Sequence, residues 1–131
     1  MKSFTDLEQS KKLAEILPIE SADMCYRIVA YNPDDTHVYQ PYCFVGTLES
    51  DIPCWSLALL LSVLPTYLFE FDRGIDLNVY PNLNGRGWHC SYMPNCIENM
   101  KTDKCKLITN GDTLVDACYE MILKLNKLNL L

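Results

Sequence analysis

Apolar residues at helical spacing mark both ends of the chain. The pattern over residues 6–17 predicts a helix with an inward apolar side. Thr5 is expected to cap this helix, and Glu8, three residues later, to complete a capping box. Residues 114–128 predict a second helix of this kind, because apolar side chains recur there at helical spacing after a cap within residues 110–113.

A third apolar run, residues 53–64, predicts the central helix. Pro53 fits the first turn of a helix, where its missing N–H costs nothing, and Asp51 suits the positive end of the helix dipole. The run is apolar almost all round, so we expect this helix to lie deep in the core or against a partner.

Two further segments near the N-terminus have the composition of strands. Residues 24–30 and 36–45 are rich in Tyr, Val, Ile, Phe and Cys, and they flank the turn-forming sequence of residues 32–35. They predict a β-hairpin. Pro41 removes a backbone donor from the second strand, which favours an edge strand or a break there.

Strand patterns return in the second half of the chain. Period-two alternation predicts a second hairpin from residues 67–71 and 75–79, followed by a strand over residues 87–93. Residues 94–104 are ambiguous, and residues 105–109 fit one more short strand.

These elements predict one α+β domain that spans residues 1–131, in the order α-β-β-α-β-β-β-α. We expect an antiparallel sheet with the helices packed on one face. With 131 residues, 49% of them hydrophobic, the chain can bury a core without a metal or a disulfide. No cofactor is predicted, because the sequence has no phosphate-binding glycine loop and no metalloprotease or hydrolase motif.

The net charge of −6 is unevenly distributed. Residues 13–72 contain nine Asp and Glu residues and a single basic residue, Arg27. Binding to nucleic acid depends on Lys and Arg that release counterions from phosphates, so we predict no nucleic-acid partner. The longest apolar run, residues 57–64, is far shorter than the roughly 20 residues that span a bilayer, so we predict no membrane partner.

Cysteine usage favours a reducing compartment. The chain has seven cysteines, an odd number, and its first residues contain no apolar signal core. We therefore expect reduced thiols and a cytoplasmic location.

Two places in the sequence offer an enzymatic alternative. Cys54 falls at the start of the predicted central helix, where backbone dipoles lower a thiol pKa, although no histidine is placed beside it by the sequence. His89 and Cys90 cluster with Cys96 and Cys105, but neighbours on a strand point to opposite faces, which argues against zinc. A small cysteine-dependent or metal-binding enzyme is the alternative function. Structural thiols are favoured, and we assign no catalytic residue and no metal ligand.

The candidate binding residues are polar and fall on the outward face of the second hairpin: Glu70, Asp72, Asp76 and Asn78. Neighbouring side chains on this face would form an oxygen-rich patch for a cation or for a basic partner surface. A solvated sheet face is the simpler explanation of the same residues.

Three blocks on the predicted helices carry a resemblance. They are LEQSKKLAEILP at residues 7–18 with ESADM at 20–24, PCWSLA at 53–58 with LP at 64–65, and VDAC at 115–118 leading into KLNKLNLL at 124–131. These blocks resemble small uncharacterised proteins of gut bacteria and of their phages or other mobile elements. The resemblance brings no established activity or site residue. It implies a cytosolic accessory protein in which a fixed helical framework presents a variable sheet surface.

The leading hypothesis is therefore a non-enzymatic binding or adaptor protein. It would act on a protein partner through the acidic middle segment or an exposed sheet face. An acidic decoy that mimics nucleic acid is a special case of this hypothesis. A homodimer stays open, since the apolar central helix and the C-terminal leucines could bury against a second copy.

Overall fold

The computed structural model describes residues 2–70, 73–94 and 107–131, and within these ranges the side chains of all residues except 67–70, 73–75 and 93–94. It confirms the α+β class, and the predicted element order recurs with an added strand, β3, and with β7, which overlaps the short strand expected over residues 105–109. The strands form two antiparallel sheets, of three and four strands, rather than the single sheet expected. The chain divides into two compact units, Ser3–Leu60 and Leu61–Leu131 with Met1–Lys2, which we call the N-terminal and C-terminal units. The single domain over residues 1–131 stays a prediction.

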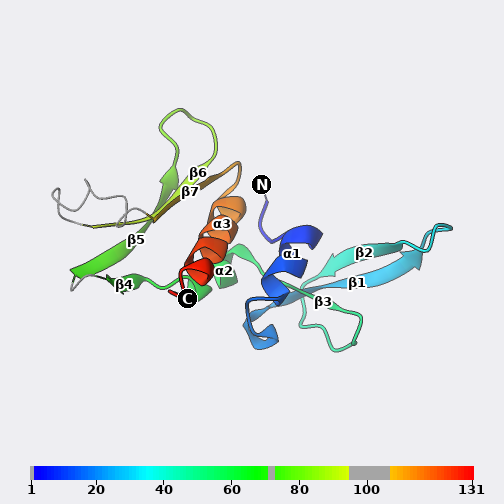
Figure 1. Cartoon of the computed structure of the whole chain (residues 1–131). Coiled ribbons are helices and arrows are strands. Elements are labelled where there is room, and N and C mark those ends of the chain that lie inside the picture. Colours follow the sequence, from blue (N-terminus) through cyan, green and yellow to red (C-terminus); the bar gives the residue numbers. More distant parts are fainter. Residues whose placement is uncertain (1, 71–72, 95–106) are drawn as a thin grey trace. The chain divides into compact units, whose positions relative to one another are not determined.

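The N-terminal unit is built on a sheet with the strand order β2-β1-β3, and α1 packs against β3 (Figure 1). Strands β1 and β2 confirm the first predicted hairpin, and Pro41 lies in the edge strand β2. The buried side chains of Met24, Tyr26 and Cys54 form a core cluster of this unit. Its elements are α1 (Leu7–Ala14), a 3-10 helix η1 (Ile19–Ser21), β1 (Met24–Tyr31), β2 (His37–Tyr42), β3 (Ile52–Cys54) and the start of α2 (Leu57–Val63).

The first helix starts one residue later than predicted, because Asp6 and not Thr5 is its cap. The Asp6 carboxylate accepts the Gln9 N–H at 2.8 Å, and the Gln9 side chain accepts the Asp6 N–H at 3.1 Å. The Thr5 hydroxyl is buried instead, 2.7 Å from that of Ser10, and it accepts the Trp55 N–H at 3.2 Å. Thr5 thus joins α1 to the segment after β3.

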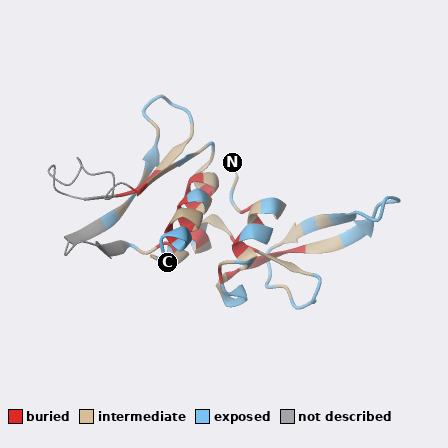
Figure 2. Ribbon diagram, in the orientation of Figure 1, coloured by how far each residue is buried: buried red, intermediate tan, exposed pale blue. Residues whose placement is uncertain are grey.

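The central helix begins at Leu57, so the predicted start at Pro53 is wrong. The Ser56 hydroxyl accepts the Leu59 N–H at 3.3 Å, and the Asp23 carboxylate accepts the Ser56 N–H at 2.9 Å. Pro53 lies in the edge strand β3 opposite Cys25, where a missing donor is tolerated. Deep burial of this helix in the core is also not found, since Leu60 is its one fully buried residue. Its burial against a partner, the other expectation, stays a prediction. Figure 2 shows buried residues along α3 instead.

The C-terminal unit is a four-stranded antiparallel sheet in chain order, with α3 lying along β6 and β7 (Figure 1). Cys90, Ser91 and Tyr92 from β6 are fully buried. The last helix is confirmed almost to the residue, with Thr113 as its cap and Asp116 completing a capping box. The elements of this unit are β4 (Tyr67–Glu70), β5 (Arg73–Pro81), β6 (Trp88–Pro94), β7 (Leu107–Gly111) and α3 (Leu114–Lys127). Within the described ranges, no helix is long and apolar enough to cross a membrane.

Candidate functional site

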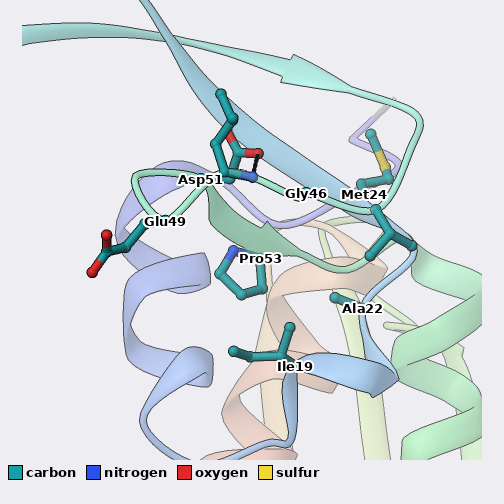
Figure 3. A pocket seen from close by; sticks show the side chains of 9 residues that line it. Ile19, Ala22, Met24, Gly46, Glu49, Asp51 and Pro53 are labelled. Atoms are coloured by element: carbon teal, nitrogen blue, oxygen red, sulfur yellow. Dashed lines mark hydrogen bonds between the residues drawn. The ribbon is translucent and has the colours of Figure 1, made fainter.

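A pocket of about 260 Å³ opens in the N-terminal unit beside the loop that joins β2 to β3, residues 43–51 (Figure 3). Helix η1 and strands β1 and β3 supply one side of this pocket, and the loop supplies the other. Seven of the nine lining residues have no charged or polar side-chain group. The lining consists of Ile19, Ala22, Met24, Val45, Gly46, Leu48, Glu49, Asp51 and Pro53.

An ion pair fixes the loop to the sheet. Asp51 accepts two hydrogen bonds from Arg27, from Nε at 2.9 Å and from Nη2 at 2.8 Å, and a third from the Leu48 N–H at 3.0 Å. The Asp51 side chain is only 3% exposed. The Arg27 bonds lower the pKa of Asp51 to about 2. The Arg27 guanidinium also lies 5.0 Å from the ring centroid of Phe44, a cation–π contact at the start of the loop.

Gly46 allows the loop to approach the sheet closely. A Cβ atom at this position would lie 2.7 Å from the Asp51 Cβ and 3.1 Å from the Cys25 Cβ, closer than carbon atoms pack. A side chain here would therefore force the loop or its neighbours to shift. The glycine is explained here by lack of space and not by backbone conformation.

Large apolar side chains stand exposed around this pocket. The exposed fractions of three lining residues are 59% for Ile19, 53% for Val45 and 54% for Leu48. Phe44, the residue before Val45, is 43% exposed. A single exposed apolar residue is ordinary, but several gathered around a concavity mark a docking surface. The loop therefore combines a fixed backbone with an apolar outer surface.

The whole formal net charge of the chain belongs to the N-terminal unit. This unit has nine Asp and Glu residues against three Lys and Arg, whereas the C-terminal unit has eight of each. Several of the nine carboxylates have partners within the unit, as Asp51 has in Arg27. Glu49 on the loop and Glu20 beside Ile19 form no hydrogen bond or ion pair with a described residue. Of these two carboxylates, Glu49 lines the pocket, and Glu20 is the chain neighbour of the lining residue Ile19 in η1.

The structure describes two of the four residues of the predicted acidic face in full, Asp76 and Asn78. Asp76 and Asn78 are exposed on β5, as expected. Asp72 and the Glu70 side chain lie outside the described residues. The Asn78 amide donates to the Asp76 carbonyl oxygen at 3.1 Å, so it is held by its own strand. The described residues contain no group of three His, Cys, Asp or Glu side chains that could hold a metal ion.

Cys54 lacks the environment of a nucleophile. It ends strand β3 instead of beginning a helix, and it is fully buried. Burial raises the pKa of its thiol, and a contact with the Thr5 hydroxyl at 3.5 Å only partly offsets this. Such a thiol stays protonated at neutral pH.

His89 and Cys90 lie on opposite faces of β6. The His89 ring stacks on Tyr80 with 4.5 Å between ring centroids, and its Nε2 has no hydrogen-bond partner in the described part of the chain. Cys90 is buried on the α3 side, where the hydrogen bond between its thiol and that of Cys118 raises the pKa of Cys118. Cys96 and Cys105, the other ligands considered, lie outside the described residues.

The pocket was missed by sequence reasoning, which extended a strand to Val45 and placed Asp51 beside the start of a helix. One signal could have revealed it. Arg27 is the single basic residue in an acidic stretch of sixty residues, and such a residue is expected to have a carboxylate partner. Which carboxylate takes that role depends on the path of the loop, which no local pattern encodes.

Compared with protein-family models, curated proteins and solved structures, the chain matches none of them. The function has to be inferred from the chemistry of the pocket.

Proposed function

We propose that this protein is a non-enzymatic binding or adaptor module that takes a protein partner at the pocket beside residues 43–51. The observation that carries this proposal is the group of exposed apolar side chains on a loop fixed by the Arg27–Asp51 pair. Covering exposed apolar surface around a concavity with a partner lowers the free energy of the complex.

The size and lining of the pocket support binding of a partner rather than catalysis. A volume of about 260 Å³ lies below the roughly 300–1,000 Å³ of small-molecule sites, and it suits one side chain of a partner. Among the described residues, the lining has no His, Cys, Ser or Lys to serve as a nucleophile. Its two carboxylates differ in role, because Asp51 is occupied by Arg27 while Glu49 is not.

A selection from a random peptide library tests this proposal. Twelve-residue peptides displayed on phage are selected on the immobilised full-length chain and then tested on two variants. The double variant Ile19→Ser with Leu48→Ser removes apolar surface from both sides of the pocket. Leu83→Ser is the matched control, because Leu83 is fully exposed in the C-terminal unit, outside the pocket.

We expect enriched peptides that bind the parent chain and Leu83→Ser but lose about tenfold or more in affinity for the double variant. Ile19 and Leu48 are each more than half exposed, so the double variant keeps its fold, which circular dichroism checks. Peptides that bind all three chains equally would place the partner elsewhere and contradict the proposal.

The wider expectations stay proposals that rest on the sequence. They are a cytoplasmic location, an accessory role for a phage or mobile element, the lack of a nucleic-acid partner, and the hypothesis of a homodimer. The acidic decoy, as a special case, draws support from the charge of the N-terminal unit.

A further inference from the structure

We infer that the partner of this pocket is a basic segment that inserts one large apolar side chain and places a Lys or Arg against Glu49. This inference rests on the proposed function and specifies the partner's chemistry. The inference concerns binding of this segment and includes no chemical reaction.

The floor of the pocket determines which kind of partner side chain can insert into it, and we call this side chain the anchor. Met24 and Ala22 are buried with 7% exposure each, and Pro53 is half-buried beside them. Figure 3 shows Ile19 and Pro53 on one side of the pocket and the loop with Gly46 on the other. A polar anchor would lose its water here without gaining a hydrogen bond. An aliphatic or aromatic side chain instead covers the apolar lining.

The charge of the rim sets the nature of the flanking residues. Glu49 lines the pocket, and Glu20 follows the lining residue Ile19 in η1. Neither carboxylate has a partner among the described residues. Around them the unit carries a formal charge of −6. Each exposed pair adds little affinity, but the field selects partners by sign and repels acidic segments.

The loop is already held in place before binding. Three hydrogen bonds to Asp51 and the contact of Arg27 with Phe44 fix both ends of residues 43–51. A preorganised site loses less conformational freedom on binding, so even a short segment can gain net affinity. This favours a linear peptide segment as the partner over a large folded surface.

Peptides from the selection described above test the inference. We expect the pocket-dependent peptides to share one Leu, Ile, Met or Phe within two positions of a Lys or Arg. Fluorescence polarisation on the full-length chain then measures three versions of the best peptide. Replacing its anchor by Ala should cost about tenfold or more in affinity, and replacing its basic residue by Glu about fivefold.

A charge exchange identifies Glu49 as the contact. The variant Glu49→Lys should bind the parent peptide about fivefold more weakly and recover affinity for the peptide whose basic residue is Glu. Glu120→Lys is the matched control, because it makes the same charge change at an exposed position of α3 and should leave both affinities unchanged.

The outcomes separate the two proposals. Pocket-dependent peptides with neutral or acidic flanks, or no recovery in the charge exchange, would overturn this inference and leave the proposed function in place. A library that yields no pocket-dependent peptide would contradict both.

Discussion

Replacing Asp51 by Asn tests whether the ion pair holds the pocket loop. One carboxylate oxygen accepts both the Arg27 Nη2–H and the Leu48 N–H, and the other accepts the Arg27 Nε–H. The single amide oxygen of Asn can replace only one of the two carboxylate oxygens. Its NH₂ group takes the place of the other oxygen, where it faces an N–H donor and cannot accept a hydrogen bond. We expect a loss of about 2 kcal/mol in the free energy of unfolding. Loss of a partner in a fully buried pair would cost more, but Arg27 is 28% exposed.

The pH dependence identifies the ion pair as the cause. The pKa of Asp51 falls from its ordinary value of 3.8 to about 2 because Arg27 bonds to the charged form. A lowered pKa stabilises the folded chain above about pH 4, and this contribution is lost as the pH falls towards 2. The difference between the parent and Asp51→Asn should therefore shrink within that window.

Urea denaturation followed by circular dichroism measures both effects, at pH 7 and at steps down to pH 2. Asp35→Asn is the matched control, because Asp35 is exposed with a φ of 66°, a conformation that Asn tolerates. It should change stability by less than about 0.5 kcal/mol. An Asp51→Asn variant as stable as the parent at pH 7, or a difference that does not vary with pH, would refute the reasoning.

Two further predictions follow from the site. Alkylation of the native chain, mapped by mass spectrometry, should modify the exposed Cys43 well before the buried Cys54, whose pKa is raised; equal rates would reopen the nucleophile hypothesis. Gly46→Ala should lower the free energy of unfolding by about 2 kcal/mol, because its Cβ overlaps that of Asp51. A thermal midpoint equal to that of the parent would show that the loop shifts without cost.

The parts of the fold that local signals determine could be predicted from the sequence. Helix α3 follows from its apolar period and its cap, and the hairpin β1–β2 from two β-rich runs around a turn. The start of α2 could not be predicted in this way. Pro53 and Asp51 satisfy the rules for a helix start, but strand pairing of Pro53 with Cys25 and the Arg27 ion pair take precedence. Both are long-range contacts.

The candidate site shows the same limit. Alternation along one strand is enough to place Asp76 and Asn78 on an outward face. The pocket combines η1, β1, β3 and a loop, and its lining residues are up to thirty-four positions apart in the sequence. Only the path of the chain in three dimensions brings them together.

Amide hydrogen exchange on the full-length chain, with and without the best selected peptide, tests the central claim most directly. We expect slower exchange in residues 43–51 and 19–22 and no change in residues 76–92 of the C-terminal unit. Slower exchange in residues 76–92 with unchanged exchange in residues 43–51 would contradict the account. It would indicate the outward face of β5 as the binding surface instead.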